Sequence, residues 1–254
     1  YITKNNGVIG IKETIVLQPI NKDKIILPIH YNHLVQAMIY EVLNEEVASF
    51  LHEEGFQNEK RVFKMFTFSR LIGNYFLDKR EGKIIFNGPV RLTISSAFNE
   101  FSNSIGNGFL SKSTVRLANN ELEVKEISVE KENVVENEIK IATLSPIVTY
   151  STLYRKDGKK FTYYFSPQER DFSELISQNL KNKCKAFYLK DVSEEVNITP
   201  LGHTKLSVVK YKGFVIKGYT GRFVMEGPIQ LLQLGIETGI GSKNSQGFGC
   251  VKII

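Results

Sequence analysis

The sequence lacks tryptophan and has only two cysteines, Cys184 and Cys250, among its 254 residues. The cysteines show neither the close spacing of a redox pair nor the paired spacing of a zinc site, so we expect reduced thiols rather than a disulfide framework. No apolar run is long enough to cross a bilayer, and no signal peptide is recognisable. These absences predict a cytoplasmic protein without a membrane partner.

Metal-ligating residues are also scarce. The sequence has only four histidines, and neither its acidic residues nor its cysteines gather around them at ligand spacing. We therefore expect no metal site and no cofactor. Lysine and arginine outnumber aspartate and glutamate by 33 to 27, which gives a net charge of +6. This excess favours a polyanionic partner but does not distinguish RNA from DNA or an anionic membrane.

Secondary-structure signals occur twice in the same order. In the first half, strands are expected at residues 14–20, 63–68, 83–95 and 114–130, and helices after Pro28, after a break at 44–46, and at 97–110. A charged stretch at 131–138 marks the domain boundary. The second half has expected strands at 139–154, 160–165, 196–211, 214–225 and 248–254, with helices at 166–185 and 228–238. Each half is thus β-α-β-β-α-β, the order of a ferredoxin-like unit.

The most specific motif lies at the C-terminal end. Two glycine triplets with an apolar middle residue, 239–241 and 247–249, flank a five-residue polar insert. The glycines Gly239, Gly241, Gly247 and Gly249 permit positive φ and close approach of main-chain amides to a negative group. Helix capping would need only one of them. The insert adds a cation and neutral hydrogen-bonding groups at Lys243, Asn244 and Ser245, which suit phosphates and 2′-hydroxyls. The loop therefore predicts binding of a phosphodiester backbone.

The C-terminal pattern resembles the signature of the CRISPR-associated repeat-specific endoribonucleases, members of the RAMP superfamily that process CRISPR precursor RNA. Further segments that resemble this family are residues 27–28, 31–33, 36–40, 50–53, 64–69 and 143–147. The resemblance implies an α+β fold of two tandem ferredoxin-like domains, which we place at residues 1–135 and 136–254. It also implies CRISPR repeat RNA as the partner.

The resemblance further implies RNA cleavage without a metal ion. A ribose 2′-OH lies beside its own phosphodiester, so attack is intramolecular and leaves a 2′,3′-cyclic phosphate and a 5′-OH. The reaction needs a base, an acid and positive charge beside the phosphorane. The family match assigns these roles to His52, Tyr40 and Lys64. His52 would move a proton, Tyr40 would act near the 2′-OH if cations lowered its pKa, and Lys64 would stabilise charge.

Each catalytic assignment has a competing interpretation from the residues alone. A histidine at a helix end beside two glutamates, as His52 is, is commonly a solvated surface residue. Tyr40 can pack its ring in the core with its hydroxyl at the edge. A single lysine on a strand, such as Lys64, is by default solvated. Lys60 and Arg61 are alternatives to Lys64, because the preceding loop is longer than is usual in the family.

The other histidines are weaker candidates. His30 and His33 precede the same helix as Tyr40, and His33 matches a family position that we expect to be structural, as an N-terminal cap. His203 is expected to contact RNA or to be inert.

A basic hairpin in the second half is expected to hold RNA. Its cations are interleaved with Tyr211, Phe214 and Tyr219, so phosphates can pair with charge while unpaired bases stack on rings. The cations are Lys205, Lys210, Lys212, Lys217 and Arg222. Alternating lysines also protect sheet edges from aggregation, which is the competing interpretation. A second candidate patch surrounds the turn at 157–158 and consists of Arg155, Lys156, Lys159 and Lys160.

Three functions follow from these residues. The first is a metal-independent endoribonuclease that cleaves CRISPR precursor RNA within its repeats. The second is a non-catalytic RNA-binding RAMP subunit of a CRISPR interference complex, and the third is an unrelated ferredoxin-like RNA-binding protein. The first two share fold and glycine loop, so His52, Tyr40 and Lys64 discriminate between them. Association with an interference complex and formation of a homodimer are left open.

Overall fold

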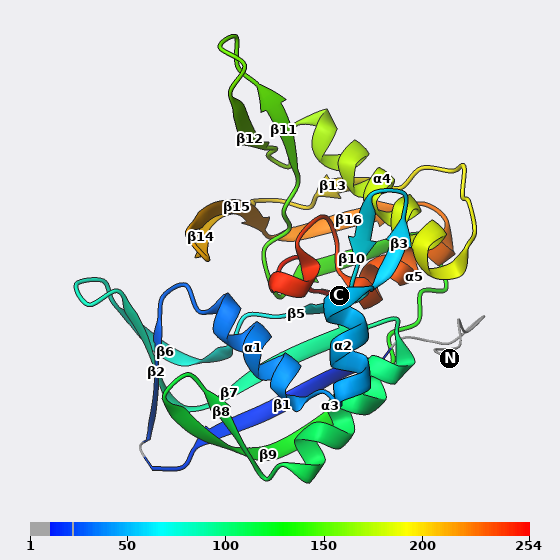
Figure 1. The fold of residues 1–254 in the computed structure, drawn as a ribbon. Helices are drawn as coiled ribbons and strands as arrows, with labels where there is room; N and C mark the ends of the chain where they lie inside the picture. The colour runs from blue at the N-terminus through cyan, green and yellow to red at the C-terminus, as the bar shows by residue number, and fades with distance from the viewer. Residues whose placement is uncertain (1–10, 22) are drawn as a thin grey trace.

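A seven-stranded antiparallel sheet forms the first half of the protein (Figure 1). The computed structural model describes residues 11–21 and 23–254. The main strand order is β2 (Lys24–Pro28), β7 (Lys83–Ser96), β1 (Ile11–Pro19), β9 (Asn120–Glu130) and β8 (Thr114–Leu117), while β5 (Phe66–Phe68) and β6 (Ile72–Asp78) also pair with β7. One face is covered by α1 (Asn32–Val42), α2 (Glu45–Glu53) and α3 (Asn99–Ser111).

A four-stranded antiparallel sheet forms the second half. Its order is β13 (Asn197–Pro200), β16 (Arg222–Glu226), β10 (Glu138–Thr143) and β17 (Val251–Ile253), and it packs with α4 (Arg170–Tyr188) and α5 (Ile229–Thr238). Two hairpins are separate from this sheet, β11 (Tyr150–Tyr154) with β12 (Lys160–Tyr164) and β14 (Lys205–Tyr211) with β15 (Phe214–Thr220). In the first sheet β1 lies between β7 and β9, and in the second sheet β10 lies between β16 and β17. The first strand of a ferredoxin-like βαββαβ unit lies in the same way between the third and fourth strands of that unit. The predicted fold class is confirmed.

Local sequence explains some element boundaries but not others. The strands expected at 139–154, 196–211 and 214–225 are each divided in two, into β10 and β11, β13 and β14, and β15 and β16. Asn44 begins α2 because its side chain accepts a hydrogen bond from the Val47 amide at 2.9 Å, so the predicted break is confirmed. The helix expected after Pro28 begins only at Asn32, because Pro28 ends β2 opposite Lys83. The single strand expected at 63–68 is divided, since Met65 has a φ of 54° between β4 (Arg61–Phe63) and β5.

The two halves share one hydrophobic core. The hairpin of β3 (Phe56–Asn58) and β4 extends from the first half onto α4 of the second. Phe56 packs edge-on against Phe187 with ring centroids 4.9 Å apart, and Asn58 donates to Asn182 at 3.1 Å. Apolar burial therefore fixes how the halves sit together. The division at 135/136 into two domains stays a prediction. No helix within residues 11–21 and 23–254 combines the length and apolarity needed to traverse a bilayer.

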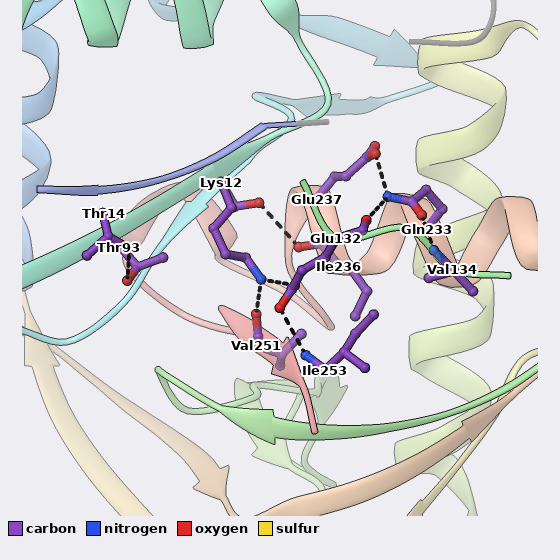
Figure 2. Close-up of polar contacts among 11 residues, drawn as sticks. Lys12, Thr14, Thr93, Glu132, Val134, Gln233, Ile236, Glu237, Val251 and Ile253 are labelled. Carbon is purple, nitrogen blue, oxygen red and sulfur yellow. Dashed lines mark hydrogen bonds and ion pairs between the residues drawn. The ribbon is translucent and has the colours of Figure 1, made fainter. Parts of the chain in front are cut away.

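A buried polar network joins the halves at a second seam (Figure 2). The ammonium of Lys12 on β1 forms an ion pair with Glu132 and donates to the Val251 carbonyl on β17 at 3.0 Å. The Glu132 carboxylate also accepts from the Ile253 amide at 3.3 Å. Gln233 of α5 donates to the Glu132 carbonyl at 2.9 Å. The charged stretch predicted as a boundary is therefore anchored to both sheets.

We expect the buried Lys12 ammonium to contribute measurably to the free energy of unfolding. Lys12→Met leaves the Glu132 carboxylate and the Val251 carbonyl without their cation, which we expect to lower the free energy of unfolding by about 3 kcal/mol. Urea unfolding measures the loss. Lys125→Met is the matched control, because Lys125 pairs with Glu123 on the surface, where both side chains are nearly half exposed, and should change stability by less than about 0.5 kcal/mol. Equal losses in the two variants would contradict this role of the seam.

Candidate functional site

The four glycines of the C-terminal loop are buried and face protein atoms. Gly247 has a φ of +83°, and a Cβ there would lie 2.4 Å from the Phe68 ring. Gly249 has a φ of +73°, and its Cβ would lie 2.0 Å from the Ile240 carbonyl oxygen. Both contacts are too short for any side chain, so glycine is required for the loop to close on itself and on β5.

The main-chain amides of this loop are largely used within the protein. The amide of Gly239 donates to Gly235 at 2.9 Å, that of Gly247 to Asn244 at 2.9 Å, and that of Gly249 to Pro146 at 2.8 Å. The side chain of Asn244 donates to the carbonyls at both ends of the loop, Ile240 and Phe248. Contact between these glycines and RNA stays a prediction. Residues 242–246 are partly exposed, so they are more accessible to a ligand than the buried glycines.

Two polar side chains of α1 hold the glycine loop in place. Asn32 donates to the carbonyls of Gln246 at 2.9 Å and Gly247 at 3.2 Å. Gln36, one turn later, donates to the Ser245 carbonyl at 2.6 Å. Sequence reasoning missed both residues. Their only signal was their place in two segments that resemble the family, 31–33 and 36–40.

Residues 143–147 also contact the glycine loop and the residue that follows it. The amide of Leu144 donates to the Cys250 carbonyl at 2.7 Å, and the Ser145 hydroxyl accepts from the Cys250 amide at 2.9 Å. Thr67 of β5 donates to the Phe248 carbonyl at 2.9 Å. Three widely separated stretches that resemble the family are therefore brought together around residues 239–249.

A cleft of about 590 Å³ opens beside the loop, between the two halves. Its walls are residues 61–66, residues 150–152 of β11, one face of α4, and residues 242–246. Four cations line it and no carboxylate does; they are Arg61, Lys64, Lys183 and Lys243. The Lys243 ammonium lies over the Tyr150 ring, 4.9 Å from its centroid, and burial lowers the pKa of this lysine. We call this pocket the cationic cleft, and its charge suits a polyanion.

Two of the three predicted catalytic residues are neighbours. The Lys64 ammonium donates to the Leu51 carbonyl and lies 3.4 Å from the His52 carbonyl, at the C-terminal end of α2. Burial lowers the pKa of Lys64, which lines the cationic cleft. His52 itself is exposed, and it is not among the residues that line the cleft. Among the alternatives, Arg61 lines the cleft and Lys60 does not.

Tyr40 has a different environment from the one predicted for a base. Its ring packs edge-on against Phe66, with centroids 6.2 Å apart, and it is only partly exposed. Burial, with a smaller contribution from Tyr211, raises its pKa to about 12. The condition that cations lower this pKa is therefore not met, and the phenol is neutral at neutral pH. Within the described residues, Tyr40 forms no hydrogen bond with His52 or Lys64.

The basic hairpin of β14 and β15 presents its predicted cations to solvent. Lys205, Lys210, Lys212 and Lys217 are exposed on this hairpin. Arg222 is also exposed, but it begins β16 and does not belong to the hairpin, so its predicted place there is wrong. Phe214 is 75% exposed and is available for stacking. Tyr211 is only 7% exposed and its hydroxyl donates to Gln36, so the prediction that it stacks on bases is wrong. The second patch, around the β11–β12 turn, is likewise exposed at 155–160.

The other histidines lie elsewhere on the protein. The residue before the first turn of α1 is Tyr31, so the expected capping role of His33 is wrong. His33 packs edge-on against Tyr211 instead, with centroids 6.3 Å apart. Burial, Lys210 and Arg70 lower the pKa of His30.

The fold is that of two ferredoxin-like units in tandem. A solved structure described as an RAMP protein binding different RNA substrates shares this fold, with a TM-score of 0.81 and 23% identity over 96% of this chain and 99% of that one. A structure described as CRISPR associated protein Cas6 is 26% identical, with a TM-score of 0.78 over 96% of this chain and 99% of that one.

Sequence comparison identifies the particular family. The family described as CRISPR-associated protein Cas6, N-terminal, matches residues 26–128, and that described as CRISPR associated protein Cas6, C-terminal, matches residues 124–253. The CRISPR-associated endoribonuclease Cas6 of Pyrococcus furiosus is 30% identical over 93% of this chain and 88% of its own. The CRISPR-associated endoribonuclease Cas6 1 of Methanocaldococcus jannaschii is 28% identical over 89% and 87%. The chain belongs to the Cas6 family, and the predicted resemblance is confirmed.

Packing of the glycine loop predicts an unequal response to two glycine substitutions. Gly247→Ala adds a Cβ that clashes with Phe68 in addition to the strain of a positive φ, so we expect a loss of more than about 2 kcal/mol in the free energy of unfolding. Gly158→Ala is the control, because Gly158 has a similar φ of +78° and open space around it, and should cost about 1 kcal/mol. Thermal and urea unfolding compare the two variants. Losses of the same size would show that Phe68 is not a constraint.

Proposed function

We propose that this protein cleaves CRISPR precursor RNA within its repeats to give guide RNAs. Family membership supports the class of enzyme, an endoribonuclease. The observation that carries the proposal for this chain is the cationic cleft, in which Lys64 lies against the helix end that bears His52. The repeat RNA would lie along residues 242–246 and the exposed cations of the β14–β15 hairpin.

Cleavage would proceed by attack of a 2′-OH on its adjacent phosphodiester, without a metal ion. His52 is the group suited to proton transfer, because an imidazole nitrogen can accept a proton from a hydroxyl and give one up again. Lys64 would face the phosphorane and stabilise its charge, because its ammonium lies at the cleft wall and carries no carboxylate partner within the part of the chain described.

The environment of Tyr40 argues against a role as the general base. With a pKa of about 12, its phenol keeps its proton at neutral pH, so it can donate or accept a hydrogen bond but is not present as a phenolate base. The proton of the 2′-OH would therefore pass to His52. Tyr40 would at most orient the ribose.

A non-catalytic RNA-binding subunit is the second candidate function. It is favoured by one observation, the exposure of His52, whose side chain forms no hydrogen bond within the described residues. Such a subunit would use the same cleft and hairpin to hold a guide RNA and would leave it intact.

Removing the imidazole separates the two functions. In excess EDTA, we expect the wild-type protein to cleave a labelled repeat RNA and His52→Ala to lower the cleavage rate by roughly 10²- to 10⁴-fold, because the proton acceptor is lost. Binding of the RNA should change little. Gel analysis gives the rate, and treatment with a phosphatase that opens cyclic phosphates identifies the 3′ end.

His203→Ala is the control, because His203 is also exposed but lies before the β14–β15 hairpin and away from α2. Its cleavage rate should equal that of the wild type. Cleavage that needs Mg²⁺, or that survives loss of His52, would contradict the mechanism. RNA binding without any cleavage by the wild type would favour the non-catalytic subunit.

The contribution of the loop to RNA binding can be measured through salt dependence. Lys243→Ala removes one cation of the cleft, so we expect weaker binding and a slope of log Kobs against log salt that is shallower by about 1. Fluorescence anisotropy over a series of salt concentrations measures the slope. Lys125→Ala, on the far β9 strand, should leave it unchanged, whereas an unchanged slope for Lys243→Ala would indicate a purely structural loop.

A further inference from the structure

Lys183 is a buried lysine of α4 that ends at the glycine loop. It is 2% exposed, and its ammonium donates to the Gly239 carbonyl at 2.7 Å, the Thr238 hydroxyl at 3.1 Å and the Thr238 carbonyl at 3.3 Å. These acceptors form the C-terminal end of α5, where a positive charge is stabilised by the helix dipole. One side chain therefore connects α4 to the first turn of the loop.

The same residue belongs to the floor of the cationic cleft. Leu175, Asn179 and Lys183 follow one another at intervals of four along α4 and line the cleft as one helix face. Because the Lys183 ammonium points to the start of residues 239–249, it lies at the point where the cleft wall and the loop meet. No sequence motif marked it, since a lysine within an amphipathic helix is by default a solvated residue.

The charge of Lys183 has no ionised partner. Within residues 11–21 and 23–254, no carboxylate lies within 4.0 Å of its ammonium. The charged groups that line the cleft with it are cations, and α5 carries one carboxylate, which accepts a hydrogen bond from Gln233 at 2.7 Å. These groups are Arg61, Lys64, Lys243 and Glu237. Cys184 and Tyr188 of α4 are neutral at neutral pH.

We infer that Lys183 is a positioning residue of the RNA-binding cleft: its ammonium holds the Thr238–Gly239 turn and supplies buried positive charge that a bound polyanion stabilises. The inference rests on the proposed function, because the polyanion is the repeat RNA. A phosphodiester in the cleft would add negative charge near Lys183, whose ammonium forms no ion pair with a described carboxylate. Binding of RNA should therefore favour the protonated form of this side chain.

Burial lowers the pKa of Lys183 to about 7 in the free protein. RNA favours the charged form, so the pKa rises in the complex, and the contribution of Lys183 to binding is complete below pH 7 and is lost as the pH rises above it. If RNA raises the pKa of Lys183 by one unit, the affinity for RNA is tenfold higher at low pH, where Lys183 is protonated, than at high pH, where it is neutral. Near pH 7, RNA binding should add a fraction of a proton to Lys183.

The experiment compares RNA affinity at pH 6 and pH 8.5 for the wild type, Lys183→Met and Lys183→Arg. The probe is repeat RNA with a single 2′-deoxyribose at the mapped cleavage site, which binds but is not cut. We expect the wild type to lose roughly five- to tenfold more affinity between these pH values than Lys183→Met does. Lys183→Arg keeps its charge at both values and should also lack this loss. All other side chains are the same in the three proteins, so the comparison isolates residue 183.

Lys185→Met is the matched control, because Lys185 lies on the same helix but pairs with Asp191 at the surface. It should behave as the wild type. Melting temperatures show which variants fold. If Lys183→Met does not fold, NMR of lysine side-chain carbons in the wild type gives the answer, with the titration midpoint of Lys183 rising when RNA is added.

Two outcomes would overturn the inference and leave the proposed function intact. In the first, all variants bind and the loss of affinity with pH is the same in the wild type and in Lys183→Met. In the second, the Lys183 midpoint is unchanged by RNA. A wild-type protein that binds no repeat RNA at either pH would instead overturn the proposed function, and the inference with it.

Discussion

Docking of the glycine loop onto α1 and β5 is the constraint on which the rest of the site depends. Asn32 and Gln36 hold the loop carbonyls, and Gly247 lets the main chain approach Phe68 without a side chain between them. Because the loop follows α5 and precedes β17, this contact brings the C-terminal half against the helices of the N-terminal half. The cationic cleft exists only when both halves are held in this way, since residues 61–66 form one wall and residues 242–246 another.

Electrostatics then makes the cleft suited to RNA. Its four cations lack a lining carboxylate, and burial lowers the pKa of Lys64, Lys183 and Lys243. Each lowered pKa reflects a charge that the folded protein solvates poorly, so a phosphodiester would be a favourable partner. The seam at Lys12 differs from the cleft, because the buried Lys12 ammonium forms an ion pair with the Glu132 carboxylate. Charge is thus neutralised where the halves join and left uncompensated where RNA would lie.

Periodicity and turn residues were enough to predict the repeated order of the main strands and helices and the break at Asn44, because these are set by neighbours in sequence. They did not predict the short strands β2 and β3. Long-range contacts were not predictable. Asn32 and Gln36 meet carbonyls more than 200 residues away, so no local pattern marks them. The pKa of Tyr40 depends on packing that only the fold defines, and Tyr211 faces inward because alternate residues of a strand point to opposite sides. The family resemblance located cleft residues 64–66 and the loop, but not the buried lysine of α4.

The central claim is that the protein itself, and not RNA, holds the glycine loop in its closed form. Amide hydrogen exchange of Gly247 and Gly249 in the RNA-free protein tests this most directly. Because both amides donate to protein carbonyls, the account predicts slow exchange before any RNA is added and little further protection afterwards. Fast exchange in the free protein, with protection appearing only when repeat RNA binds, would contradict it.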